Sequence, residues 1–211
     1  MLDDSQFDCT IKLLVLGGSS VGKSNFIHRF ITNKFSENHI SSSGLELKSS
    51  EITIKNKRIR VQLWDTAGQE KYKSLTKSLF VKVQGIIAMF DLTNEDSFNQ
   101  AKFWIKSIRE ECGSRMPLIL LGNKSDLEEQ REVSKEEGQQ KAELYKLAFM
   151  ETSALNGNNI EKAFTELVND VYKNHHNSIE NDAKIDLNDK GVDLNDAKEN
   201  NEEKKKCCGS S

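Results

Sequence analysis

The sequence predicts an α/β fold, with a mostly parallel six-stranded sheet and helices on both of its faces. Up to about residue 174, apolar segments of strand length alternate with segments whose apolar residues recur at helical spacing. Residues 85–91 and 117–122 are apolar almost throughout, which is typical of parallel strands buried on both faces. A chain of 211 residues that is 36% hydrophobic and has one proline is the size of one such domain with a polar appendage.

The first part of the chain predicts a strand, a helix and a hairpin. Residues 11–16 are apolar and rich in β formers, and residues 25–31 place four apolar side chains at helical spacing. Residues 45–54 and 58–64 are also rich in β formers, with the polar residues 55–57 between them as a tight turn. We expect these two segments to pair as a hairpin.

The second part continues the alternation. Ser134 and Glu137, three residues apart, predict a capping box at the start of a helix that ends near Lys146. The other predicted elements are a weak helix to about Val81, a strand over 85–91, a helix with the apolar residues Phe98, Ala101, Ile105 and Ile108, a strand over 117–122, a last strand over 147–150 and an amphipathic helix from Ile160 to Val171.

The segment between the first strand and the first helix has the spacing of a phosphate-binding loop. Gly17–Ser24 reads G-x-x-x-x-G-K-S. Glycines let backbone N–H groups turn around a phosphate, and the helix N-terminus adds the positive end of its dipole. Lys23 would reach the β- and γ-phosphates of a nucleotide, and the Ser24 hydroxyl would ligate Mg²⁺. A flexible turn that matches by chance is the alternative, and the flanking strand and helix argue against it.

A second motif indicates the base. Asn123-Lys124-Ser125-Asp126 fits N-K-x-D and follows an apolar segment. One carboxylate can accept hydrogen bonds from both the N1–H and the exocyclic amine of guanine, and adenine offers no such pair of donors. Alone, this tetrapeptide is a common surface turn, but about a hundred residues after a phosphate loop it predicts guanine. Since the loops that carry these groups each follow a strand, we expect them at one edge of the sheet, facing one ligand.

Composition argues against several classes of protein. Nine acidic residues and six lysines between His176 and Lys206 account for the net charge of −3, so the rest of the chain is formally neutral and nucleic-acid binding is not favoured. The longest apolar run, Ile86–Phe90, is too short to span a bilayer, and the acidic start Met1–Asp4 does not resemble a signal peptide. We therefore expect a cytosolic protein in which Cys9 and Cys112 are reduced thiols.

The α/β pattern stops after Asn174. Residues 175–206 are rich in Asn, Asp and Lys, a composition that predicts a disordered tether, with a short helix around Leu187 and Leu194 as the alternative. The predicted organisation is a domain over residues 9–174, the tether over 175–206 and a terminal segment over 207–211.

The chain resembles small GTPases of the Ras superfamily, and most closely the Rab branch, from about Cys9 to Tyr172 and again at the C-terminus. The shared motifs are Gly-Gly-Ser-Ser-Val-Gly-Lys-Ser at 17–24, Trp-Asp-Thr-Ala-Gly-Gln-Glu at 64–70, Asn-Lys-Ser-Asp at 123–126 and Glu-Thr-Ser-Ala at 151–154. Rab-like stretches are Lys71–Thr76, Phe90–Thr93 and Asp96–Phe98. In this order and spacing the motifs are highly specific.

This resemblance implies a role for each matching residue. Gln69 would orient the attacking water and Lys23 would hold the phosphates, so these are the expected catalytic residues. Mg²⁺ would be held by Ser24, Ser42 and, through a water, Asp65. The residues expected to contact GTP or GDP are Gly17, Ser19, Ser20, Val21, Gly22, Lys23, Ser24, Asn25, Phe35, Ser42, Gly68, Asn123, Lys124, Asp126, Ser153 and Ala154.

Other implied roles concern the base and the switches. Phe35 would cover the guanine face, Asn123 would brace the phosphate loop, and Lys124 would lie along the base and ribose. Ser153 and Ala154 would support the base, Ala154 through its N–H to the guanine O6. The segments around Ser42 and Gly68 would be switches that γ-phosphate and Mg²⁺ order and that hydrolysis releases, with the Gly68 N–H sensing the γ-phosphate.

Several positions depart from the family pattern. Ser42 replaces a threonine and keeps only its hydroxyl, so we expect Mg²⁺ ligation to survive and the closed switch to be less populated. Ser43 and Leu47 replace apolar and aromatic residues, and Leu79–Val83 replaces Tyr-Tyr-Arg-Gly-Ala, which alters the usual effector surface. Ser20 replaces a glycine, a milder change because small side chains occur there.

The C-terminus carries Cys207 and Cys208 directly after three lysines. The resemblance implies a geranylgeranyl group on each cysteine, and two chains with a basic patch give stable membrane anchoring. One farnesyl group on Cys208, read as C-a-a-X, and an unmodified pair of thiols are the alternatives.

The function implied is a membrane-anchored small GTPase that hydrolyses GTP to GDP and acts as a switch in vesicle trafficking. It would occupy the cytosolic face of an endomembrane, with a GDP-bound pool in the cytosol. The expected partners of this monomer are an exchange factor, a GTPase-activating protein that supplies an arginine, a GDP-dissociation inhibitor or escort protein, and effectors, but no nucleic acid. The alternatives are a nucleotide-binding adaptor with little hydrolysis, favoured by Ser42–Leu47 and opposed by Gln69, and a Ras- or Rho-type signalling switch, opposed by the cysteine pair.

Overall fold

The computed structural model describes residues 6–36, 45–66 and 78–189, with the side chains of the last helix described as far as Asn174. In chain order the elements are β1 (Cys9–Leu16), α1 (Lys23–Thr32), β2 (Leu45–Ile54), β3 (Lys57–Thr66), β4 (Gly85–Asp91), α3 (Glu95–Cys112), β5 (Leu118–Asn123), the short 3-10 helix η3 (Glu128–Gln130), α4 (Lys135–Tyr145), β6 (Ala148–Glu151) and α5 (Ile160–Asp189). Residues 78–80 are also helical, and the rest of the weak helix predicted before Val81 lies outside the described residues.

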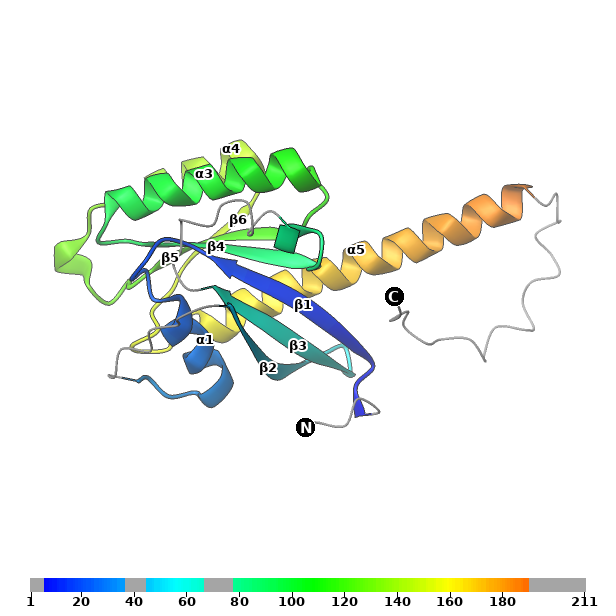
Figure 1. Cartoon of the computed structure of the whole chain (residues 1–211), viewed down its shortest axis with the longest axis horizontal. Coiled ribbons are helices and arrows are strands. Elements are labelled where there is room, and N and C mark those ends of the chain that lie inside the picture. The colour runs from blue at the N-terminus through cyan, green and yellow to red at the C-terminus, as the bar shows by residue number, and fades with distance from the viewer. Residues whose placement is uncertain (1–5, 37–44, 67–77, 190–211) are drawn as a thin grey trace.

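All six strands belong to one sheet, in the order β2-β3-β1-β4-β5-β6 (Figure 1). Among these strands β2 alone is antiparallel to its neighbour, and every other pair is parallel. The β2–β3 hairpin turns at Lys55 and Asn56, whose φ angles of 48° and 63° are the positive values that a two-residue hairpin turn requires. The prediction of a mostly parallel six-stranded sheet is confirmed.

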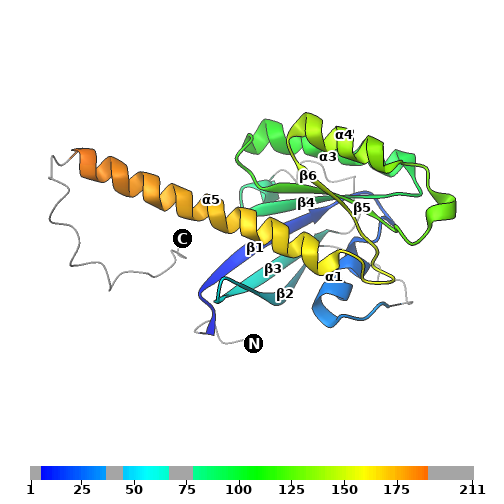
Figure 2. The same cartoon turned by 180° about the vertical axis from the view of Figure 1, so that it is seen from behind.

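Among the elements named above, α1 and α5 cover one face of the sheet, and α3 and α4 cover the other (Figures 1 and 2). On one face, Phe26 and Phe30 of α1 stack on Phe164 of α5, with ring centroids 4.9 Å and 3.9 Å apart. On the other face α3 and α4 pack on the sheet, and Phe98 of α3 lies 4.7 Å from Phe90 of β4 between ring centroids. The sheet is therefore buried on both sides, which explains why β4 is apolar throughout.

Helix α4 begins at the predicted capping box. The Ser134 hydroxyl accepts from the N–H of Glu137 at 3.2 Å, and the Glu137 carboxylate accepts from the N–H of Ser134 at 2.9 Å. This exchange satisfies two N–H groups that the start of a helix otherwise leaves open. The prediction is confirmed, and β6 lies one residue later than the predicted strand over 147–150.

Helix α5 is longer than the sequence predicts. Val171 packs in the core and the Asn174 amide donates to the Arg115 carbonyl at 3.1 Å, and from there the helix runs to Asp189 and leaves the domain (Figures 1 and 2). The sequence predicts a disordered tether from residue 175, whereas the helix of the structure continues over residues 175–189, a segment that contains no glycine or proline. The added turns extend the helix by about 22 Å at 1.5 Å per residue. Leu194 and the rest of the predicted tether lie outside the described residues.

Helix α5 is long but not strongly apolar. Within residues 6–36, 45–66 and 78–189, no helix, α5 included, is both long enough and apolar enough to cross a membrane.

Candidate nucleotide-binding site

Most of the predicted site residues lie at one edge of the sheet. The phosphate loop follows β1, Asp65 lies at the end of β3, and residues 123–126 and 151–154 lie at the ends of β5 and β6. These strands are parallel, so their carboxyl ends point to the same edge. The structure thus brings four segments that are far apart in sequence around one place.

The phosphate loop is closely packed. A Cβ atom on Gly17 would come within 2.3 Å of the Met89 carbonyl oxygen, so the loop approaches β4 at a distance that only glycine allows. The Lys23 side chain is 5% exposed and its Nζ donates to the carbonyl oxygens of Gly17 and Gly18 at 2.8 and 2.7 Å. A buried ammonium group is thereby held over the loop, where a phosphate would be bound.

Ser20 adopts a conformation that the sequence does not reveal. Its φ of 62° lies in the left-handed region, which costs a residue with a side chain roughly 1–2 kcal/mol. The replacement of the usual glycine is therefore more costly than the small size of serine suggests. Ser19 and Ser20 are both exposed, so the hydroxyl groups themselves meet no steric obstacle.

Asn123 connects the phosphate loop to the base-binding loops. It is 1% exposed, and its Nδ2 donates to the Val21 carbonyl oxygen at 2.9 Å. Its Oδ1 accepts from the Thr152 hydroxyl at 3.3 Å. This geometry agrees with the brace expected of Asn123, and it adds Thr152, a residue that the sequence did not single out.

Replacing Gly22 with alanine tests this brace. Gly22 has a φ of 94°, and a Cβ atom there would lie 2.5 Å from Asn123 Nδ2. We expect Gly22→Ala to lower the free energy of unfolding by roughly 1–3 kcal/mol through backbone strain, and to weaken GDP binding about 10-fold because the Asn123 amide must move.

The matched control is Gly113→Ala. Gly113 also has a positive φ, of 70°, but a Cβ atom there would meet nothing within 4 Å. Urea unfolding and equilibrium binding of GDP separate the two effects. Equal GDP affinities for the two variants would show that the contact with Asn123 has no influence on binding.

The two base-binding loops contact each other directly. The Ser153 hydroxyl donates to Asp126 Oδ1, and the Ser125 N–H donates to the Thr152 carbonyl at 3.0 Å. Ser153 is fully buried and Ala154 is 5% exposed. The hydroxyl of Ser153 therefore orients the carboxylate that is predicted to recognise guanine.

Lys124 is fixed by an acid from a third strand. Its Nζ lies 2.6 Å from Asp91 Oδ2, and Asp91 also accepts from the N–H and hydroxyl of Thr93 at 2.9 and 2.8 Å. Asp91 received no role from the sequence. Its position at the carboxyl end of the buried strand β4 was the available signal, because that is where ligand-binding side chains gather.

Asp65, one of the predicted metal ligands, has an oxygen with no partner among the described residues. Asp65 is fully buried, and its Oδ1 has no hydrogen-bond partner within the described part of the chain. A buried carboxylate oxygen is rarely left unpaired, so a bound water or ion is expected there. Ser24, which is 8% exposed, supplies a hydroxyl at the end of the loop. A hydroxyl and a carboxylate are oxygen donors that suit Mg²⁺.

Lys48 also contacts Asp65, and the sequence gave no indication of it. Its Nζ lies 3.4 Å from Asp65 Oδ2. In the hairpin register Lys48 faces Leu63, which makes Lys48 a diagonal neighbour of Asp65 across the strand pair. Only the register reveals this contact.

The remaining predicted residues lie at the margins of the site or beyond the described chain. Phe35 is half-buried on the segment that follows α1, and Asn25 Oδ1 is a buried acceptor with no partner among the described residues. Ser42, Gly68, Gln69, Cys207 and Cys208 lie outside the described residues.

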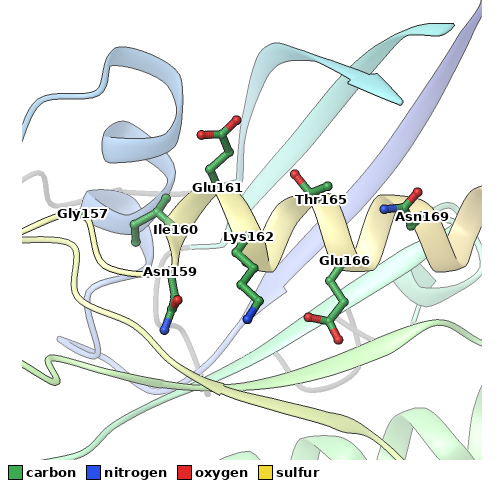
Figure 3. A pocket seen from close by; sticks show the side chains of 8 residues that line it. All are labelled: Gly157, Asn159, Ile160, Glu161, Lys162, Thr165, Glu166 and Asn169. Carbon is green, nitrogen blue, oxygen red and sulfur yellow. The ribbon is translucent and has the colours of Figure 1, made fainter. Parts of the chain in front are cut away.

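A separate pocket of about 590 Å³ lies along the first turns of α5 (Figure 3). Glu161 and Thr165 project to one side of the helix, and Lys162 and Glu166 to the other. None of the residues that line it belongs to the four loops above. This open hollow is therefore distinct from the candidate nucleotide site.

Comparison with known proteins agrees with this geometry. Residues 12–173 match the Ras family. The chain is 44% identical over 172 residues to Ras-related protein Rab-11B of Dictyostelium discoideum, covering 82% of this chain and 78% of that protein. It is 38% identical over 175 residues to human Ras-related protein Rab-15, covering 83% and 82%. Ras-related protein Rab2BV of Beta vulgaris is 34% identical over 207 residues, covering 97% of both chains.

Proposed function

The chain belongs to the Ras family of small GTPases and is Rab-like, and from that membership we propose that it is a membrane-anchored timer in vesicle trafficking. The family makes it a GTP hydrolase. The observation that best supports nucleotide binding is that Lys23, Asn123 and Asp126 lie at one edge of the sheet. There Asn123 bonds to Val21 of the phosphate loop and Ser153 bonds to Asp126.

Guanine nucleotides would bind across this edge. Lys23 and the N–H groups of the phosphate loop face the phosphates, and Asp126, oriented by Ser153, accepts from the two guanine donors. Lys124, held by Asp91, lies along the base and ribose, and the Ala154 N–H bonds to O6. Phe35 covers the other face of the base.

Catalysis by this chain would consist of positioning and electrostatics. Gln69 orients the attacking water, Lys23 neutralises charge on the β- and γ-phosphates, and the Gly68 N–H binds the γ-phosphate. Ser24, Ser42 and, through a water, Asp65 would hold Mg²⁺, which would supply positive charge against the negative charge that develops on the phosphates. An arginine supplied by an activating partner would accelerate hydrolysis by about 10³–10⁵, the range for this superfamily.

Membrane attachment would depend on Cys207 and Cys208. Two geranylgeranyl chains anchor a protein stably, and the lysines before them attract anionic lipid. Helix α5 adds about 22 Å of spacing between the domain and this anchor. The exchange between a GTP-bound membrane form and an extracted GDP-bound form requires an exchange factor, an activating protein and a GDP-dissociation inhibitor, with effectors recognising the GTP state.

The attachment is tested by mass spectrometry and vesicle flotation of the protein from eukaryotic cells. We expect a C-terminal peptide with two geranylgeranyl groups, and flotation that is lost in Cys207→Ser/Cys208→Ser with GTP binding unchanged. One farnesyl group would indicate Ras-like processing, and flotation of the unmodified double variant would overturn the proposed anchor.

A nucleotide-binding adaptor is the second candidate. Leu45 and Leu47 of β2 are 50% and 58% exposed, and Leu47 replaces an aromatic residue of the family pattern, so the surface that binds partners is altered. Retention of Gln69 opposes this candidate. Single-turnover hydrolysis of GTP separates the two, because an adaptor would bind GTP and leave it intact.

A further inference from the structure

Arg131 connects the two base-binding loops. It follows η3, only five residues after Asp126, and its guanidinium reaches Glu151 at the end of β6, with N–O distances of 2.9 and 3.2 Å. The same guanidinium binds Glu128 at 2.7 and 2.8 Å and donates to the Val133 carbonyl oxygen at 3.0 Å. All of its donors thus serve to hold neighbouring segments together.

Glu151 is the last residue of β6 and directly precedes the loop that carries Ser153. Its carbonyl oxygen accepts from the Asn159 amide at 2.8 Å, so both its main chain and its side chain are fixed. Two residues later the Ser153 hydroxyl donates to Asp126. The contacts form a closed path from Asp126 along the chain to Arg131, across to Glu151, and back through Ser153.

The pair between Arg131 and Glu151 is protected from solvent. Both side chains are 18% exposed, whereas Glu128 is 69% exposed. Ion pairs with little exposure and two parallel hydrogen bonds are stronger and less screened than surface pairs. Hydrogen bonds to Glu128 and Glu151 raise the pKa of Arg131 above its ordinary value, so the guanidinium remains charged at any working pH.

We propose that Arg131 is a positioning residue for guanine recognition, which sets the distance between the loop of Ser153 and Ala154 and the loop of Asp126. This inference rests on the proposed assignment of those three residues to the base. Arg131 donates its hydrogen bonds to Glu128, Val133 and Glu151, so it would act on the nucleotide through these loops. Lysine would not replace it fully, because a single ammonium cannot present the planar fork that engages both carboxylates.

The test measures the affinities of the full-length protein for GDP and for IDP. Inosine lacks the exocyclic amine of guanine, so the ratio of GDP to IDP affinity reports on the second hydrogen bond to Asp126. Dissociation rates of both nucleotides, the thermal unfolding midpoint and single-turnover hydrolysis of bound GTP are measured for Arg131→Met, Arg131→Lys, Glu151→Gln and the double variant. Glu128→Gln removes the exposed partner, and Arg58→Met removes an arginine from an exposed pair with Glu51 at 3.0 Å.

We expect Arg131→Met and Glu151→Gln each to speed GDP release about 10-fold, to lower the GDP:IDP affinity ratio, and to leave hydrolysis of bound GTP unchanged. Their effects should not add in the double variant, because both remove the same contact. Arg131→Lys should restore part of the ratio, and Glu128→Gln and Arg58→Met should resemble the natural protein.

Two results would overturn the proposal. The first is an unchanged GDP:IDP affinity ratio in variants whose unfolding midpoint is normal. The second is an equal acceleration of GDP and IDP release together with a lowered unfolding midpoint, which would show that Arg131 has a purely structural role. If Arg131→Met does not fold, the GDP:IDP affinity ratio of Glu151→Gln tests the proposal in its place. Failure of the underlying guanine assignment is recognised separately, since the natural protein would then show no preference for GDP over IDP.

Discussion

Replacement of Lys23 with methionine should weaken binding of GTP by about 10²–10⁴-fold. Hydrogen bonds to charged groups contribute roughly 1.5–3 kcal/mol each, and Lys23 is expected to make two, to the β- and γ-phosphates. At 5% exposure the ammonium group is screened little by solvent, and methionine keeps an unbranched side chain of similar reach without its charge.

Equilibrium titration with a fluorescent GTP analogue measures this loss. Lys34→Met is the matched control, because Lys34 lies exposed just after α1. The unfolding midpoint without nucleotide shows whether the lost bonds to Gly17 and Gly18 disturb the loop. An affinity within threefold of that of the natural protein would mean that the phosphates bind elsewhere.

Replacement of Asp126 with asparagine should reverse the base preference. Asparagine can accept from N1–H but offers an amide donor where guanine also has a donor, so GTP binding should fall by about 10²–10⁴-fold. Xanthine carries a carbonyl at that position, which accepts from the new amide. Binding of XTP should therefore rise as that of GTP falls, and the Ser153 hydroxyl can still donate to the asparagine oxygen.

Displacement of one bound fluorescent nucleotide by GTP and by XTP, in separate titrations, gives the base preference directly. Glu129→Gln, which removes an exposed acid from the neighbouring 3-10 helix, should keep the preference for GTP. An Asp126→Asn protein that still selects GTP over XTP would show that another group recognises the base.

The fold was predictable where burial imposes a pattern along the chain. Strand β4 was predicted with its observed bounds because every residue in it is buried. The capping box was predictable because its two members interact over three residues. The end of α5 was not predictable from the sequence. The polar composition after Asn174 indicates a lack of core contacts, but it does not indicate whether the helix continues.

The site divides in the same way. Lys23 and Asp126 were predicted from the spacing of short motifs, and Asn123 and Ser153 received their roles from the family resemblance. The contacts that support these residues were not predicted, because those from Lys48 to Asp65, from Arg131 to Glu151 and from Thr152 to Asn123 join residues 17, 20 and 29 positions apart. Such pairs depend on strand register and loop packing, which no local pattern encodes.

Single-turnover hydrolysis of GTP in the presence of Mg²⁺, by the natural protein and by Gln69→Leu, tests the GTPase timer most directly. We predict slow hydrolysis by the natural protein, on the order of 10⁻⁴ s⁻¹ as for Ras without a partner, and its loss in Gln69→Leu with GTP still bound. Ser42→Thr should accelerate the natural rate if the closed switch is underpopulated. Bound GTP that neither the natural protein nor Ser42→Thr hydrolyses would contradict the timer and favour the adaptor.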